Sequence, residues 1–317
     1  MDNASTPRRI ASLLASGTEI LYGLGLGERV VAVSHECDFP STVAGKPRVT
    51  TSHVAAPTSG EIDNQVRQRL AAGQPLYGID VETLVRLAPD LIVTQAQCDV
   101  CAVKYEDVLA MVRDEPALHA TRVVALNPMT LADIFADVDR IGEATRTVDT
   151  AKGFISALQK RVDAVREKSA TVSRDRRPRV AAIEWIEPLM LAGNWMPELL
   201  ELAGGVQPLA HKGQHSTYSE YQDLVAFDPE VILVLPCGFD LARAVAEADS
   251  FFKLPGWHDL AAVRDGRVYA LDGNAYFNRS GPRIVDSLEI VAGLLHPKLF
   301  GMPSDMRDGI SVWQQLG

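Results

Sequence analysis

The sequence predicts an α/β protein with two lobes, each built on a parallel sheet, joined by one long helix. Three observations support this prediction: apolar β-branched runs alternate with helical patterns at the start of the chain, a long helical stretch follows, and the alternation then resumes. Strands that alternate with helices are typical of parallel βαβ units. We therefore expect an N-terminal lobe over 1–129, a connecting helix over 130–172 and a C-terminal lobe over 173–317.

Elements of the N-terminal lobe follow from the spacing of apolar residues. Val81, Leu84, Val85 and Ala88 recur at helical spacing, for example, and the pattern stops at Pro89. In chain order we expect a strand at 9–15, a helix at 18–24, strands at 29–34 and 91–94 with a helix at 80–90 between them, a helix at 104–114 and a strand at 122–126.

The stretch from 130 to 170 contains no proline and has the periodicity of a helix. Gly142 and Gly153 are its weak points, but no strong turn signal interrupts it. One helix is therefore expected here, with an apolar side formed by Leu131, Ile134, Phe135, Val138, Ile141 and Val148.

The C-terminal lobe repeats a phrase of the first one. "LVRLAPDLIVTQAQC" and "LVAFDPEVILVLPC" each combine a helix, a proline, an acidic residue, an apolar strand and a cysteine. This similarity indicates an internal structural repeat. The expected elements are strands at 179–185, 231–236 and 267–271 and helices at 196–205, 219–230, 240–248 and 281–297.

The charge and the apolar runs exclude several classes of partner. The formal net charge is −10, which disfavours nucleic acid or an anionic membrane surface as a partner. No apolar run is long enough to span a membrane. We do not expect the N-terminal residues to form a signal peptide, because polar residues interrupt the segment after Arg8 and Arg9. We therefore expect a cytoplasmic protein, or a periplasmic one if a leader has been removed.

All four cysteines follow apolar runs that we predict as strands: Cys37, Cys98, Cys101 and Cys237. Ligand sites in open parallel sheets lie beyond the carboxyl ends of the strands. Four thiolates there could bind zinc or an iron–sulfur cluster. The alternative is that the cysteines are small apolar residues that pack near strand ends. A redox role for the Cys-x-x-Cys pair is disfavoured, because the pair does not begin a helix after the first strand.

Other candidate ligand-binding residues lie at or near the expected strand ends. Aromatic faces there can hold a large macrocycle, although packing beneath loops explains each aromatic residue equally well. An arginine could bind phosphate or propionate groups. No nucleophile elbow, phosphate-binding loop or His-Glu-x-x-His motif occurs, so we do not expect an enzyme. The candidates are His35, Glu36, Gln95, Gln97, Glu184, Trp185, Trp195, Tyr276, Phe277 and Arg279.

Most of the chain resembles the cobalamin and iron-siderophore branch of ABC-transporter substrate-binding proteins. The resemblance rests on "RIASLLASGTEILYGLGLGERVVAVSHECDFP", on the two Pro-acidic-strand phrases and on "NRSGPRIVDSLEIVAGLLHP". It implies the class III substrate-binding-protein fold, with two Rossmann-like lobes and one long interlobe helix. The Ser-x-Thr-Glu turn of the branch corresponds to Ser16, Thr18 and Glu19, so we add Ser16 and Thr18 to the ligand-binding candidates.

The resemblance implies that the protein binds cobalamin or a related corrinoid in the interlobe cleft without catalysis. Without a leader or lipid anchor, we expect intracellular handling or sensing of this small molecule rather than docking to an ABC permease. The alternative is a cysteine-ligated metal or iron–sulfur protein with a redox or sensing role in the same cleft. The chain also departs from the branch by an insertion of about 25 residues over 52–77, before the helix at 80.

Overall fold

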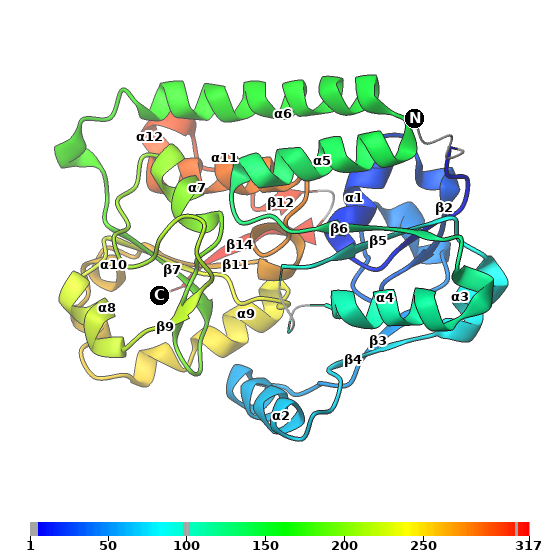
Figure 1. Cartoon of the computed structure of the whole chain (residues 1–317). Coiled ribbons are helices and arrows are strands. Elements are labelled where there is room, and N and C mark those ends of the chain that lie inside the picture. The colour runs from blue at the N-terminus through cyan, green and yellow to red at the C-terminus, as the bar shows by residue number, and fades with distance from the viewer. Residues whose placement is uncertain (1–5, 98–99, 101, 308–309, 317) are drawn as a thin grey trace. The chain divides into compact units, whose positions relative to one another are not determined.

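A computed structural model describes residues 6–97, 100, 102–307 and 310–316 of the chain. The chain divides into two compact units, which are coloured by residue number in Figure 1. The N-terminal unit comprises the chain up to Pro57, Asn64–Pro128 and Ala132–Ala157. The C-terminal unit comprises Thr58–Asp63, Met129–Leu131 and Leu158–Gly317. Within the described residues, no helix combines the length and the apolar character that spanning a bilayer requires.

The N-terminal unit is built on a four-stranded sheet in which all paired strands are parallel. Its strands, in spatial order, are β2 (Val30–Val33), β1 (Ile10–Ser12), β5 (Leu91–Gln95) and β6 (Arg122–Leu126). Every residue of β1 and β5 is buried. Such apolar runs are typical of a parallel sheet that is covered on both faces.

Helices cover both faces of this sheet. On one face, Leu84 of α3 (Val81–Leu87) and Val108 of α4 (Tyr105–Asp114) pack in a core cluster with Ala11 and Ile92. On the other face, α1 (Ala15–Gly23) packs closely, because a Cβ at Gly17 would lie 2.8 Å from Val93 Cγ1. The short 3₁₀ helices of the unit are Gly27–Arg29, Ser41–Gly45 and Pro116–Leu118.

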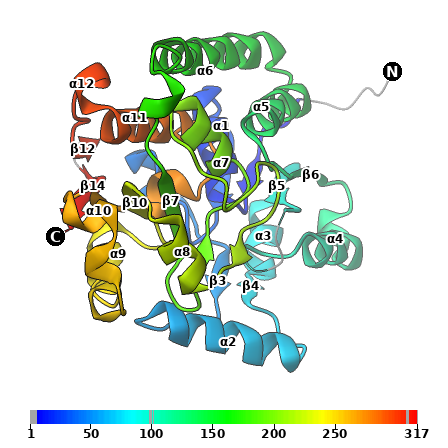
Figure 2. The ribbon, with the colours of Figure 1, turned by 90° about the vertical axis from the view of Figure 1, so that its left-hand side faces the viewer.

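The inserted segment has a structure of its own. Strands β3 (Thr50–Ser52) and β4 (Tyr77–Ile79) pair antiparallel, and α2 (Ser59–Ala71) lies between them in sequence (Figure 2). The first residues of α2 belong to the C-terminal unit. There, buried Ser59 donates its backbone amide, at 2.7 Å, and its hydroxyl to Glu247 Oε1. The Ser59 hydroxyl also accepts from the backbone amide of Glu187 at 3.1 Å.

The stretch predicted as one long helix forms two helices, α5 (Leu131–Thr145) and α6 (Val148–Ser169). Arg146 has a φ of +58°. The amide of Arg146 donates to the carbonyl of Glu143, and the amide of Thr147 donates to the carbonyl of Gly142. This pair of bonds is the Schellman motif that ends many helices. The prediction of a single helix was wrong because arginine occupies the left-handed position where glycine is usual. The boundary between the two units falls inside α6, between Ala157 and Leu158.

The C-terminal unit is built on a six-stranded mixed sheet. β7 (Val180–Trp185), β10 (Val231–Val234) and β11 (Val268–Leu271) are parallel, as predicted. Three antiparallel strands extend this core, and the sequence analysis did not predict them: β8 (Met190–Leu191), β9 (Thr217–Tyr218) and β14 (Trp313–Leu316). β12 (Met306–Arg307) and β13 (Ile310–Ser311) form a separate antiparallel pair.

The alternation of side chains along β7 divides the core of this unit between the two faces of the sheet. Ala181 and Ile183 pack in one cluster with Leu224 of α8 (Tyr221–Phe227) and Ala244 of α9 (Leu241–Ala248). Figures 1 and 2 show α7 and α11 on the opposite face from α8 and α9. The remaining helical segments are α7 (Met196–Leu202), α10 (Ala261–Arg264), α11 (Ile284–Leu295), α12 (Pro297–Phe300), a π-helical turn at Gly273–Phe277 and 3₁₀ turns at Arg174–Arg176, Phe251–Lys253 and Trp257–Asp259.

The repeated phrase of the sequence forms the same local structure in both units. Helix α3 ends at Ala88 with φ +41°, and α8 ends at Asp228 with φ +45°, each directly before the proline of the phrase. The acidic residue after the proline accepts a hydrogen bond from the backbone amide of the residue that precedes a neighbouring parallel strand. Asp90 accepts from Arg9, and Glu230 accepts from Arg179. The expected internal repeat is thus present in the local backbone.

Candidate ligand-binding edges of the two units

Most of the predicted ligand-binding residues lie just beyond the carboxyl ends of parallel strands, where open α/β sheets bind ligands. In the N-terminal unit they follow β1, β2 and β5, which are neighbours in the sheet. In the C-terminal unit they follow or end β7 and β11. We call these regions the N-terminal edge and the C-terminal edge, and describe each by itself.

Three of the predicted residues at the N-terminal edge are enclosed by protein. Ser16 and Thr18 belong to α1 and are buried, as is Cys37 after β2. The Thr18 hydroxyl oxygen lies 3.1 Å from Cys37 Sγ. This contact joins the segment after β1 to the segment after β2, and it therefore helps to fix the shape of the edge.

His35 is held in place by neighbours on β3, on β4 and in the segment after β2. Its Nδ1 lies 2.7 Å from the hydroxyl oxygen of Thr50, and its Nε2 lies 3.1 Å from Glu36 Oε1. The Thr50 hydroxyl donates to Ser34, and the Tyr77 ring lies 5.8 Å from the His35 ring, centroid to centroid. His35 is partly exposed and Glu36 is exposed. Ser34, Thr50 and Tyr77 were not predicted.

Gln95 is the last residue of β5, and Gln97 lies two residues beyond it. Gln95 is buried, and its side-chain oxygen accepts from the backbone amide of Gln97 at 2.8 Å. Gln97 is partly exposed. Cys98 and Cys101, which we predicted beyond this strand, lie outside the described residues.

At the C-terminal edge, β7 presents a carboxyl group and an aromatic ring in succession. Glu184 Oε2 accepts a hydrogen bond of 2.6 Å from the Ser216 hydroxyl. Burial raises the pKa of the Glu184 carboxyl, and hydrogen bonds from Ser216 and from the Gly193 amide act in the opposite direction. The Trp185 ring makes an edge contact with Phe239 at 5.5 Å, and the Arg243 guanidinium lies 3.7 Å from the Phe239 ring centroid. Ser216, Phe239 and Arg243 were not predicted.

The remaining aromatic candidates are part of the core. Trp195, Tyr276 and Phe277 are each less than 5% exposed, and the Trp195 indole donates to the carbonyl of Phe277. Packing, the alternative interpretation from sequence, therefore describes these three side chains. Trp185 is the predicted aromatic residue that stays partly exposed.

A π-helical turn shapes the end of β11. Asp272 accepts from the backbone amide of Ala275 at 2.7 Å and so begins the turn. A Cβ at Gly273 would lie 2.1 Å from the carbonyl oxygen of Pro236, so glycine is required there. Arg279 is buried and donates to the side-chain oxygen of Asn274 at 3.2 Å. The predicted Arg279 is therefore held inside the edge.

Two predicted metal ligands lie in different units. Cys37, in the N-terminal unit, is buried, and Cys237, in the C-terminal unit, is partly buried. Among the residues that the structure describes, no three His, Cys, Asp or Glu side chains form a metal-binding group. Because Cys98 and Cys101 are not among them, the four-cysteine site stays a prediction.

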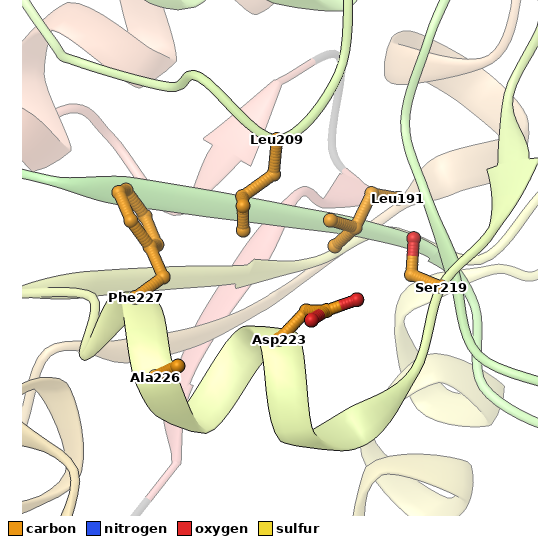
Figure 3. Close-up of a pocket in the computed structure, with 6 residues that line it drawn as sticks. All are labelled: Leu191, Leu209, Ser219, Asp223, Ala226 and Phe227. Atoms are coloured by element: carbon orange, nitrogen blue, oxygen red, sulfur yellow. The ribbon is translucent and has the colours of Figure 1, made fainter.

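A surface pocket of the C-terminal unit lies apart from the predicted residues. It has a volume of about 350 Å³ and is bounded by β8, α8 and the loop at Leu209 (Figure 3). Leu191, Leu209 and Phe227 contribute apolar side chains to its lining, and Ser219 and Asp223 contribute polar ones. None of the predicted ligand-binding residues lines this pocket.

Comparison with known proteins defines the class of this chain. Residues 10–275 match the family model described as periplasmic binding protein, and the chain belongs to this family of solute-binding proteins. It is 24% identical over 297 residues to an uncharacterized ABC transporter substrate-binding lipoprotein of Bacillus subtilis, which covers 93% of this chain and 82% of that protein. It is 25% identical over 288 residues to the vitamin B12-binding protein of Vibrio cholerae, with 90% and 88% covered.

Solved structures share the fold. A possible iron-binding protein of Staphylococcus epidermidis matches with a TM-score of 0.69 and 20% identity, over 92% of this chain and 100% of that one. The periplasmic vitamin B12-binding protein BtuF of Vibrio cholerae matches with a TM-score of 0.63 and 22% identity, over 92% and 97%. The heme-binding protein RhuT of Roseiflexus matches with a TM-score of 0.68 and 21% identity, over 91% and 98%. The fold class and the family predicted from sequence are thereby confirmed.

Proposed function

We propose that this protein binds cobalamin or a related corrinoid, without catalysis, through the N-terminal and C-terminal edges. The observation that carries the proposal is the placement of partly exposed His35 at the end of one parallel sheet and of Glu184 and Trp185 at the end of the other. A ring can stack against the indole of Trp185, and polar groups at the ring periphery can bond to the carboxyl group of Glu184.

The comparisons support this ligand class. Several similar sequences are named vitamin B12-binding proteins, and similar folds include vitamin B12-binding and heme-binding proteins. Corrinoids and heme are both large, flat tetrapyrrole-type rings with polar side chains at the rim. A solute-binding family also fits the absence of a known catalytic motif in the sequence.

Titration of the purified protein with cyanocobalamin, followed by corrin absorption and by calorimetry, tests the proposal. We expect a saturable change at about one ligand per chain. No spectral change and no heat at high micromolar ligand would overturn the proposal.

Variants connect binding to the edges. His35→Ala and Trp185→Ala should each weaken binding by about tenfold or more, since a well-placed polar or stacking contact contributes over 1 kcal/mol. His119→Ala is the matched control. His119 is an exposed histidine that precedes β6, so it lies near the amino end of that strand, whereas the N-terminal edge lies at the carboxyl ends of the strands. Equal affinities of all three variants and the unmodified protein would contradict the placement of the site.

The cysteine-ligated metal site remains the alternative function predicted from sequence. The Cys-x-x-Cys spacing of Cys98 and Cys101 favours it. Elemental analysis of anaerobically purified protein tests it directly. Zinc or iron near one equivalent per chain would support this function, and less than a tenth of an equivalent would exclude a permanently loaded site.

A further inference from the structure

The surface pocket beside α8 contains an acidic side chain that the protein does not neutralise. Asp223 is exposed in the first turn of α8 and lines this pocket. Its backbone amide donates to the carbonyl of Glu220, but among the described residues its carboxylate makes no hydrogen bond and no ion pair. No arginine, lysine or histidine of the described chain lines the pocket. A cation that enters therefore meets an uncompensated negative charge.

Apolar surface lies next to this carboxylate. Phe227 is four residues after Asp223, so the two side chains are neighbours on one face of α8. Leu191 of β8 belongs to the core cluster of the unit, and partly buried Leu209 packs against that cluster. The pocket thus places a carboxylate beside the outer surface of a hydrophobic core (Figure 3).

The parts of the pocket are held in place by contacts within the protein. Leu224 fixes α8 to the core cluster, and the Tyr221 hydroxyl donates to the carbonyl of Pro255 at 3.2 Å. The backbone amide of Ser219 donates to the carbonyl of Leu189 at 2.9 Å, which holds the segment before α8 next to the segment before β8. A pocket that is formed in advance loses little binding free energy to the ordering of its own residues.

The size of the pocket suits a compact ligand rather than a macrocycle. Its volume of about 350 Å³ is at the lower end of the range of about 300–1,000 Å³ for small-molecule sites. We propose that this pocket is a second binding site, separate from the two edges, for a compact organic cation: a primary ammonium group on an apolar body. The ammonium group contacts Asp223, and the apolar body covers Phe227 and the two leucines. Corrinoid binding at the edges is not required for this site.

Three straight-chain probes of equal length test the charge and the location together. n-Hexylamine is a cation at neutral pH, 1-hexanol is neutral and hexanoate is an anion. Amide NMR of the isotope-labelled full chain, titrated with each probe up to about 20 mM, gives the affinities and the residues affected. We expect saturable shifts in residues 219–227. Hexylamine should bind about threefold more tightly than hexanol and about tenfold more tightly than hexanoate, because the carboxylate attracts the first and repels the last.

Substitution assigns the preference to Asp223. In Asp223→Asn, the affinity for hexylamine should fall about threefold and approach that for hexanol, which should change little. Ala226→Trp, at an exposed position that lines the pocket, fills it and should weaken both probes by about fivefold or more. Asp249→Asn, which changes an exposed carboxylate directly after α9 in the same unit, is the matched control and should leave all three affinities unchanged.

The site and its ligand class can fail separately. Absence of a saturable shift in residues 219–227 with hexylamine would overturn the site. Equal affinities for hexylamine and hexanoate, or a preference for hexylamine that persists in Asp223→Asn, would overturn the ligand class. Circular dichroism of each variant confirms that it folds. If Ala226→Trp does not fold, the affinities measured with Asp223→Asn decide.

Discussion

Asp90 and Glu230 hold equivalent positions in the two units. Asp90 accepts hydrogen bonds from the backbone amides of Arg8 and Arg9 at 2.8 and 3.1 Å. Glu230 accepts from the backbone amide of Arg179 at 3.0 Å. The Arg9 side chain in turn donates to the carbonyl of Leu87 at the end of α3. The Arg179 side chain donates to the carbonyl of Asp228 at the end of α8. The Pro-acidic phrase thus ties the end of a helix to the start of a neighbouring strand in each unit.

Removal of either carboxylate should destabilise its unit. We expect Asp90→Ala and Glu230→Ala each to lower the free energy of unfolding by about 1–3 kcal/mol, since hydrogen bonds to charged groups contribute in that range. Urea unfolding measures the change. Asp114→Ala is the control: Asp114 is exposed and pairs with the adjacent Arg113, so its loss should leave the free energy of unfolding almost unchanged. Equal effects in all three variants would contradict the structural role.

The helix break at Arg146 provides a second prediction. Because a left-handed backbone is strained for residues with a Cβ, Arg146→Gly should raise the free energy of unfolding by about 0.5–1 kcal/mol. Lys160→Gly, at an exposed position in the interior of α6, should instead lower it by about 1 kcal/mol. Thermal unfolding of the two variants distinguishes a break at 146 from a continuous helix, for which both substitutions would be destabilising.

Ser59 anchors the start of α2 in the C-terminal unit. Ser59→Ala removes the hydroxyl that bonds to Glu247 and to the Glu187 amide, at a fully buried position. We expect a loss of about 1–3 kcal/mol in the free energy of unfolding, because buried polar groups lose their partners. Hydrogen exchange should be faster in the first turn of α2. Ser41→Ala, at an exposed position, should change neither quantity; exchange in α2 that is unaffected by Ser59→Ala would contradict the prediction.

Glu184 should make stability depend on pH. Its pKa in the folded protein is raised above the ordinary value of 4.5, so the folded state binds this proton more tightly than the unfolded state. The resulting stabilisation is fully present below the unfolded pKa and is lost as pH rises through the folded pKa. The melting temperature of Glu184→Gln should therefore rise relative to that of the unmodified protein as pH increases from 4 towards 8. A difference that stays constant over this range would show that the carboxyl does not titrate differently in the two states.

Local patterns predicted much of the backbone. The apolar runs at 91–94 and 231–236 form β5 and β10, and the helix before β5 ends just ahead of Pro89, which was predicted as its stop. These elements were predictable because buried parallel strands need continuous apolar residues, and proline cannot continue a helix. The break at Arg146 was not predictable, since neither glycine nor proline marks it.

The candidate site was predicted only in part. The positions of His35, Glu184 and Trp185 at strand ends follow from the order of strands and helices along the chain. Their partners Thr50, Ser216 and Phe239 come from distant segments that sequence patterns do not bring together. Burial of Trp195, Tyr276 and Phe277 also depends on which elements cover them.

The sequence by itself determined the α/β class, the parallel strand cores and the family, because these depend on local apolar patterns and on ordered motifs. Tertiary structure decided the antiparallel pairing of β14 with β11, the hydrogen bond between Glu184 and Ser216, and which aromatic residues enter the core. Each of these depends on contacts between residues far apart in the chain. Such contacts form only when the whole unit excludes water, so no single window of sequence contains them.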